Sequence, residues 1–296
     1  DRNCLMFGRI GRVFGRLGVT GLKHGETAAV SYEGPGDIVS GATIWGSSAR
    51  AYSAAFAASA AAIMDLVDQA GANPITINIL TTGFADVTAI TNWVTANSVS
   101  TIKVTKIYDQ TGNGNHCVQA TLANMPSLTL SAINGLPGMT GVAANAPNLT
   151  TAGTFSTVQP YTATSVFNQT ATTGSTGTAF GAGSGNAMIV GGSTSVNTAT
   201  ASGTASLSTA ATNGSFHAIQ GIFNGATNSV LNVDDTEVTG SLGTSALSGS
   251  LRFFRGILGN SLTGMVMEGG LWPAAFSAGE RTAMNSNLHG ASGYNF

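Results

Sequence analysis

The chain consists largely of short runs in which apolar and polar residues alternate, separated by turns rich in glycine, asparagine and serine. Such runs predict β-strands, because successive side chains of a strand point to opposite faces. The Thr- and Ser-rich stretch 194–214 favours further strands over a linker. The clearest runs are 75–80, 100–109, 161–169, 187–192, 217–225, 229–235, 250–258 and 264–272.

One long stretch, 49–69, carries a helical pattern instead. It is rich in alanine, which has the highest helix propensity. Its larger apolar residues recur at helical spacing, which leaves Asp65 and Asp68 facing solvent. The sequence therefore predicts a helix over most of 49–69.

Two shorter helices are expected elsewhere. The run 85–97 follows a glycine and predicts a short helix. In 275–290, Ser277 stands at a plausible N-cap with Glu280 three residues later, which is the pattern of a capping box. Apolar residues at helical spacing then give this last helix a buried face.

Length and composition favour a single large β-domain. The chain has 296 residues, 43% of them hydrophobic, but only 8% are charged and 40 are glycine. Short strands joined by small-residue turns suit this composition. We therefore expect a mostly β protein, a concanavalin-like jelly-roll β-sandwich over residues 31–296 with a few peripheral α-helices.

The first 30 residues differ from the rest and are expected to form a basic, Gly-rich arm. The formal net charge is −2, so the chain as a whole has no nucleic-acid signature. Nevertheless several cations gather at the start of the chain. The arm is either a solvated, mobile terminus or an anchor onto a partner subunit, with the arginines Arg2, Arg9, Arg12 and Arg16 as its contacts.

Membrane and redox signals are weak. No window is long and apolar enough to span a membrane, and no signal peptide is recognisable in residues 1–23. Two cysteines cannot form a disulfide framework. Cys117 is expected to be a free buried thiol, and Cys4 is a candidate for a bridge between chains.

The segment IYDQTGNGNH, residues 107–116, places an aromatic ring, an acid, amides and an imidazole around a Gly-rich turn. One interpretation is a glycan-binding surface. The other is a hydrogen-bonded turn of the scaffold, in which Asp109 accepts from the amides of 111–114 and His116 packs against Tyr108. The residues concerned are Tyr108, Asp109, Gln110, Asn113, Asn115 and His116.

This segment, together with GPGDIVSGATIWGSSARAYSAAF (34–56) and TTGFADVTAITNWV (81–94), resembles the catalytic domain of family 54 α-L-arabinofuranosidases. The resemblance implies a β-sandwich related to lectin-like jelly rolls, and activity on the arabinose side chains of plant polysaccharides. The C-terminal third is similar to the last strands of concanavalin-like or laminin-G-like modules. That second likeness concerns the fold and implies little about chemistry.

The acids do not follow the pattern of that family. A retaining glycosidase uses two carboxyl groups about 5 Å apart. The segment that best matches the one holding the family's nucleophilic glutamate is 185–192, where Asn186 or a neighbour stands in its place. No aspartate follows Asp235, although the family's acid/base aspartate precedes a segment resembling 264–272. The remaining, weak catalytic candidates are Asp234, Asp235 and Glu268, the last matching a family glutamate outside the catalytic pair.

No cofactor or metal site is expected. The four histidines are scattered, without the spacing of metal ligands, and no nucleotide-binding fingerprint is present. Trp45, Trp93 and Trp272 are candidates for stacking on sugars, but core positions are the more favoured interpretation.

These observations favour a non-catalytic carbohydrate-binding or structural surface protein on an arabinofuranosidase-like scaffold. We expect a virion or appendage component, such as a phage decoration protein, at a virion or extracellular surface. The N-terminal arm would hold it to other subunits of an oligomeric assembly, and glycans are possible partners, whereas nucleic acid and a membrane span are not expected. The first alternative is an active α-L-arabinofuranosidase, and the second is a soluble lectin.

Overall fold

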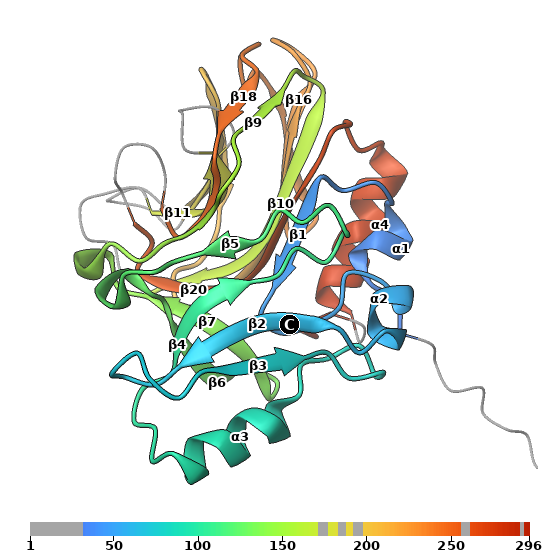
Figure 1. The fold of residues 1–296 in the computed structure, drawn as a ribbon. Helices are drawn as coiled ribbons and strands as arrows, with labels where there is room; N and C mark the ends of the chain where they lie inside the picture. Colours follow the sequence, from blue (N-terminus) through green and yellow to red (C-terminus); the bar gives the residue numbers. More distant parts are fainter. Residues whose placement is uncertain (1–31, 171–176, 183–187, 192–197, 256–260, 291–292) are drawn as a thin grey trace, which may run out of the picture. The chain divides into compact units, whose positions relative to one another are not determined.

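The computed structural model describes residues 32–296 apart from 171–176, 183–187, 192–197, 256–260 and 291–292 (Figure 1). Residues 32–296 form one compact unit. The expected arm and its proposed contacts, namely Arg2, Arg9, Arg12, Arg16 and Cys4, lie outside the described residues. The anchor and the interchain thiol therefore remain predictions.

The unit is mostly β and built from antiparallel strands, which confirms the predicted fold class. One layer pairs its strands in the order β1 (Ile44–Ser47), β20 (Gly264–Trp272), β10 (Tyr161–Gln169), β15 (Phe216–Phe223), β16 (Ser229–Val233) and β17 (Thr236–Gly240). A small separate pair joins β9 (Phe155–Thr157) to β18 (Leu247–Gly249).

The second layer runs through ten strands in the order β14 (Ser206–Ala210), β13 (Thr198–Ser202), β12 (Met188–Gly191), β11 (Thr178–Ala182), β19 (Leu251–Phe253), β8 (Leu149–Thr151), β5 (Cys117–Val118), β4 (Lys103–Ile107), β2 (Ala62–Val67) and β3 (Ile75–Asn78). Strands β6 (Ser127–Ile133) and β7 (Leu136–Gly141) connect β4 to β20 and so join the two layers.

The main core lies between the layers. Phe167 and Phe223 of the first layer belong to the same buried cluster as Phe180 and Phe253 of the second. A second buried cluster covers the other face of the first layer, where Trp272 packs with residues of the last helix. Burial on both faces explains why every residue of β10 is buried.

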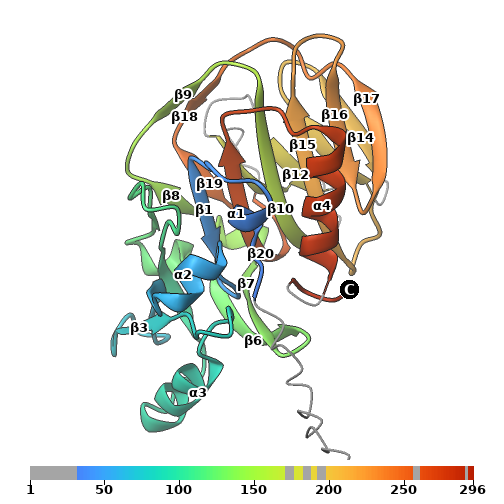
Figure 2. The same ribbon diagram turned by 90° about the vertical axis from the view of Figure 1, so that its right-hand side faces the viewer.

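In the part of the chain that the structure describes, four α-helices lie at the periphery, as expected: α1 (Pro35–Ile38), α2 (Ala54–Ala58), α3 (Val87–Ala96) and α4 (Ala278–His289). Two single 3-10 turns are η1 (Leu122–Asn124) and η2 (Ala143–Asn145). Helix α4 begins with the predicted capping box of Ser277 and Glu280 and lies along the strands of the first layer (Figure 2). None of the helices in the described part of the chain is long and apolar enough to cross a membrane.

The long helix predicted over 49–69 is wrong. Only Ala54–Ala58 is helical, and it ends where Ala60 adopts a left-handed backbone with φ of 49°. Residues Ala62–Val67 instead form β2, which pairs with β3 on one side and β4 on the other. Tertiary pairing and the burial of Ile63 and Leu66 outweigh the helix propensity of the alanines.

Candidate functional site

The segment 107–116 forms a tight loop between β4 and β5, and Asp109 is its centre. One carboxylate oxygen of Asp109 accepts from the backbone amide and the hydroxyl of Thr111, at 3.1 and 2.8 Å, and from the amide of Trp45 at 3.2 Å. The other oxygen accepts from the amide of Asn115 at 2.9 Å. Buried carboxylates with such donors hold a turn in shape. The amides used are those of Thr111 and Asn115, which corrects in part the set 111–114 expected from sequence.

The amide side chains of the loop are occupied by main-chain groups. Gln110 accepts from the amide of Tyr52 at 2.7 Å. Asn113 and Asn115 both donate to the carbonyl of Thr43, at 3.1 and 2.8 Å. These contacts tie the loop to the segments on either side of β1. They fit the interpretation of a scaffold turn for this part of the motif.

The remaining members of the motif face outward and meet residues of neighbouring strands. His116 contacts the Tyr108 ring edge-on, with 5.0 Å between ring centroids, as the scaffold interpretation expects. Its Nδ1 accepts from the amide of Asp109 at 3.0 Å. Burial and the nearby ammonium of Lys106 lower the pKa of His116, which keeps Nδ1 free to accept.

Tyr108 in turn orients a carboxylate of β2. Its hydroxyl donates to the two oxygens of Asp65 at 3.2 and 3.0 Å. Burial and the neighbouring Asp65 raise the pKa of Tyr108, so the hydroxyl keeps its proton at neutral pH. The Nζ of Lys106 lies over the Tyr108 ring, 3.9 Å from its centroid, which is a cation–π contact. Tyr108, Lys106 and Asp65 thus form an outward row of aromatic and charged side chains.

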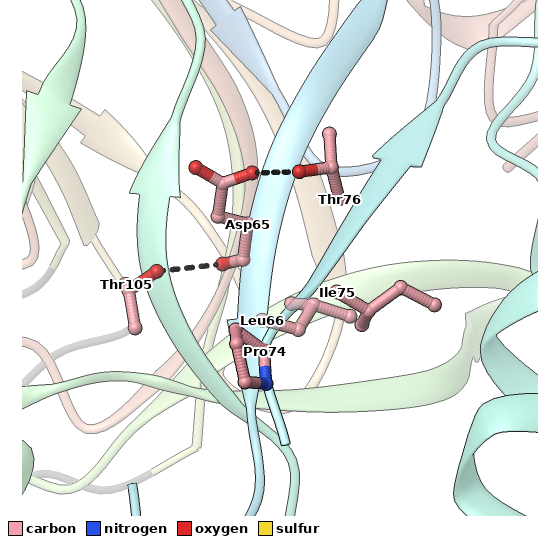
Figure 3. Close-up of a pocket in the computed structure, with 6 residues that line it drawn as sticks. All are labelled: Asp65, Leu66, Pro74, Ile75, Thr76 and Thr105. Carbon is pink, nitrogen blue, oxygen red and sulfur yellow. Dashed lines mark hydrogen bonds between the residues drawn. The ribbon is translucent and has the colours of Figure 1, made fainter. Parts of the chain in front are cut away.

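An open pocket of about 400 Å³ is lined by Asp65, the carboxylate that Tyr108 contacts (Figure 3). Asp65 and Thr76 are cross-strand neighbours on β2 and β3, and the Thr76 hydroxyl donates to Asp65 at 2.7 Å. The Thr105 hydroxyl of β4 donates to the backbone carbonyl of Asp65 at 3.1 Å. The lining consists of Asp65, Leu66, Pro74, Ile75, Thr76 and Thr105.

The weak catalytic candidate Glu268 is enclosed in the protein. Glu268 and Arg50 both have fully buried side chains and form a bidentate ion pair, with two N–O distances of 2.9 Å. The hydroxyl of Tyr294 donates to the same carboxylate at 2.7 Å. Burial opposes the charged form of Arg50, but the facing Glu268 together with the nearby Tyr32 and Tyr294 outweighs burial and raises the pKa of Arg50. This pair can hold β20 to the segment after β1, and it presents no carboxylate to a ligand.

Asp234 and Asp235 occupy the two-residue turn between β16 and β17, both with a left-handed backbone, φ 48° and 67°. Asp234 contacts Nδ1 of His217 and, at 3.1 Å, Nε2 of His289. Asp235 accepts from the side-chain amide of Asn285 at 2.7 Å. These contacts join the turn to helix α4, and none of them involves the 107–116 loop.

Most other carboxylates of residues 32–296 also have structural contacts. Asp37, Asp86 and Glu280 accept from backbone amides at helix N-termini. Asp68 accepts from two amides of a turn, and Glu237 pairs with Arg281. Among residues that the structure describes, no group of three or more His, Cys, Asp or Glu is arranged to hold a metal. Trp45, Trp93 and Trp272 are buried, which bears out core positions over stacking surfaces.

Sequence reasoning missed Asp65 and Arg50 because both lie in the stretch predicted as a helix. A signal for the strands was present. Two apolar runs, AIMDLV and ITIN, flank the polar turn DQAGANP, which is the pattern of a hairpin. The pairing of Arg50 with Glu268 spans more than 200 residues of chain, and no local pattern indicates it.

Comparison with solved structures finds proteins with a similar fold. The chain is similar to a glutamate-to-glutamine mutant of a family 54 α-L-arabinofuranosidase soaked with 4-nitrophenyl α-L-arabinofuranoside, with a TM-score of 0.67 and 18% identity. It is also similar to an arabinofuranosidase complexed with arabinofuranosyl-α-1,2-xylobiose (TM-score 0.64, 20% identity) and to a family 54 α-L-arabinofuranosidase soaked with a cyclic sulfate inhibitor (0.66, 19%).

Each match covers 86% of this chain and 64% of the other, so the chain spans less than two thirds of the length of those enzymes. No known protein family and no curated protein matches the sequence. The part of the predicted segment 185–192 that would hold the family's nucleophile, including Asn186, lies outside the described residues. At these identities the likeness establishes the fold: a β-sandwich of the kind found in carbohydrate-active arabinofuranosidases.

Proposed function

We propose that this chain is a carbohydrate-binding protein that uses an arabinofuranosidase-like scaffold without hydrolysing glycosides. The observation that carries the proposal is the use of its carboxylates. The chain has 13 acids, and all except Asp1 and Glu26 lie in the described residues. Of these, Asp65 alone lines the open pocket, while the sequence candidates Asp234, Asp235 and Glu268 are held by histidine, asparagine and arginine.

A non-catalytic role follows from the chemistry of glycoside hydrolysis. Retaining and inverting enzymes both need a pair of carboxyl groups flanking the scissile bond, separated by about 5 to 10 Å. A single carboxylate beside hydroxyl groups can instead accept hydrogen bonds from sugar hydroxyls. The pocket residues therefore support binding more than catalysis.

The direct test measures hydrolysis and binding on the same preparation. The full chain is incubated with 4-nitrophenyl α-L-arabinofuranoside and with arabinoxylan, and nitrophenol and reducing ends are followed. We expect no turnover above the uncatalysed rate, together with retardation of the chain in gels containing a polysaccharide. A hydrolysis rate that saturates with substrate, and that disappears when one aspartate is changed to asparagine, would overturn the non-catalytic proposal.

The first alternative is an active α-L-arabinofuranosidase, favoured by the likeness to solved enzymes of that activity. The assay above decides between the two. The second alternative is a soluble lectin that does not assemble.

We further propose that the chain belongs to a surface assembly such as a virion or appendage, held through Arg2, Arg9, Arg12 and Arg16. The grouping of cations in the first residues of the sequence supports this part. Sedimentation of the full chain and of a variant with all four arginines changed to alanine tests it. Assembly in the original chain and loss of assembly in the variant support the anchor, whereas a monomer in both cases favours the lectin.

A further inference from the structure

We propose that the pocket between β2, β3 and β4 is a subsite for one neutral sugar unit, with Asp65 and Thr76 as its hydrogen-bonding groups. This inference rests on the proposed carbohydrate-binding function and gives that function a location and a ligand class. Asp65 lines the pocket (Figure 3) and accepts from the hydroxyl of Tyr108, whose ring lies against the ammonium of Lys106.

The polar side of the pocket has unused accepting capacity. A carboxylate offers about four acceptor positions. One oxygen of Asp65 accepts from Thr76 at 2.7 Å and from Tyr108 at 3.2 Å, while the other accepts, among the described residues, from Tyr108 alone, at 3.0 Å. The hydroxyl of Thr76 donates to Asp65, which leaves its oxygen able to accept. Two adjacent acceptors on neighbouring strands match the two adjacent hydroxyl donors of a sugar ring.

The other side of the pocket is apolar. The exposed Pro74 and the half-buried Ile75 contribute its aliphatic lining, while the side chain of Leu66 behind them is fully buried in the main core. A sugar ring has the same two-sided character, with hydroxyl groups at its edge and C–H groups on its faces. Ligand pockets in proteins combine mostly apolar walls with a few placed polar groups, in volumes of roughly 300 to 1,000 Å³. The volume of about 400 Å³ is at the lower end of that range. It suits one sugar ring, either at the end of a polysaccharide chain or in a side branch.

Charge favours a neutral ligand. Asp65 is the acid of the lining, so a uronate or sulfated sugar would meet a like charge. Lys106 lies over one face of the Tyr108 ring, which prevents a sugar from stacking there. Tyr108 is therefore a positioning residue that holds the carboxylate of Asp65, and the C–H contacts come from the aliphatic wall.

An NMR titration tests directly whether sugars bind in the pocket. The full chain, with isoleucine and leucine methyl groups labelled, is titrated by NMR with L-arabinose, D-xylose, D-galactose and D-glucose, and separately with galacturonate and spermidine. We expect at least one neutral sugar to shift the methyl resonances of Ile75 in a saturable way. Two variants, Asp65→Asn and Thr76→Val, should each weaken that sugar about tenfold, the effect of losing one good hydrogen bond to a charged or well-placed group.

Matched controls separate the pocket from general effects. Thr239→Val changes an exposed strand threonine on β17, and Glu33→Gln removes one negative charge from an exposed residue outside the pocket lining. Both controls should bind as the original chain does. The unfolding midpoint of every variant is measured, and Thr76→Val serves as the second probe if Asp65→Asn unfolds.

Failure of the subsite differs from failure of the proposed function. If the chain is retarded by a polysaccharide but Asp65→Asn and Thr76→Val bind equally well, the sugar site lies elsewhere and this inference is overturned, while the proposed function stands. If neither polysaccharide nor monosaccharide binds, both are wrong. If spermidine saturates the pocket and neutral sugars do not, the pocket is a cation site and the inference is again overturned.

Discussion

Arg50 and Glu268 form a bidentate ion pair in which neither side chain is exposed to solvent. The pair links the segment after β1 to the middle of β20, and Asn287 of α4 accepts from the same guanidinium at 2.8 Å. The segment after β1 thus meets two elements near the end of the chain, β20 and α4, at one charge pair. Such an arrangement is strongly destabilised when a single partner is removed, because the other charge stays buried without its counter-ion.

Changing Glu268→Gln is therefore expected to lower the free energy of unfolding by about 3 to 5 kcal/mol. Denaturant unfolding measures this loss. The double variant Arg50→Met/Glu268→Leu should recover a large part of it, because no uncompensated charge remains. A loss below about 1 kcal/mol in the single variant would show that water reaches the pair.

The carboxylate of Asp109 gives a second prediction. Asp109→Asn replaces an acceptor oxygen by an NH₂ group that faces backbone N–H donors. We expect a loss of about 1.5 to 3 kcal/mol in unfolding free energy, the usual effect of losing hydrogen bonds to a buried charged group. Asn113→Ala, which removes contacts at a more exposed part of the same loop, should have a smaller effect. Equal losses in both variants would contradict a central role for Asp109.

How far sequence reasoning succeeds depends on the range of the interactions. The capping box at Ser277 and the strand 161–169 were predictable, because their signals lie within a few residues. The scaffold interpretation of the 107–116 loop was also available, since Asp and Asn at a Gly-rich turn have local partners. What could not be read locally is which outward groups of that loop meet β2.

The stretch 49–69 shows why the rest failed. Alanine-rich sequence favours a helix in isolation, yet β2 has neighbours on both sides that the chain reaches only after residue 75. Pairing with β3 and β4 brings Asp65 beside Tyr108 and Thr76. Because the pocket depends on this pairing, the error in secondary structure hid the candidate site as well.

Cys117 is predicted to be unreactive in the folded protein. Its side chain is buried and in no disulfide, and burial followed by the nearby Asp109 raises the pKa of its thiol. The thiolate is the reactive form. In a Cys4→Ser background, a thiol reagent such as Ellman's should label Cys117 only as fast as the chain unfolds. Labelling at the rate of a free small thiol in the native protein would contradict the prediction.

The two histidines at Asp234 predict a stability that depends on pH. Both ring nitrogens of His217 face oxygen acceptors, Asp234 and the carbonyl of Thr212 at 2.9 Å, which requires an imidazolium to satisfy both. Burial disfavours that charge, but the contacts with Asp234 and Thr212 outweigh it and raise the pKa of His217. The contact with Asp234 also raises the pKa of His289, with a smaller contribution from the nearby Asp235.

The sign of the effect follows from the raised pKa of each histidine. Their contribution to stability is fully present below their unfolded pKa, about 6.5, and is lost as the pH rises through their folded values. Asp234 acts in the opposite direction. Burial would raise the pKa of Asp234, but the two histidines lower it to about 2, so its contribution is lost only in strong acid. The free energy of unfolding should therefore fall as the pH rises above about 6.5 and through the raised folded pKa values of the two histidines, by roughly 1.4 kcal/mol for each unit of pKa shift.

Denaturant unfolding at a series of pH values tests this relation with matched variants. His217→Gln and His289→Gln together should flatten this decline above about pH 6.5. His116→Gln is the control, because the pKa of His116 is shifted in the opposite direction. The pKa of His116 is lowered by burial and Lys106, so its contribution is present above its unfolded pKa and is lost as the pH falls. The control should change the free energy of unfolding at acid pH and leave its decline at alkaline pH unchanged. A decline that persists in the His217→Gln/His289→Gln double variant would show that Asp234 and its histidines are not the cause.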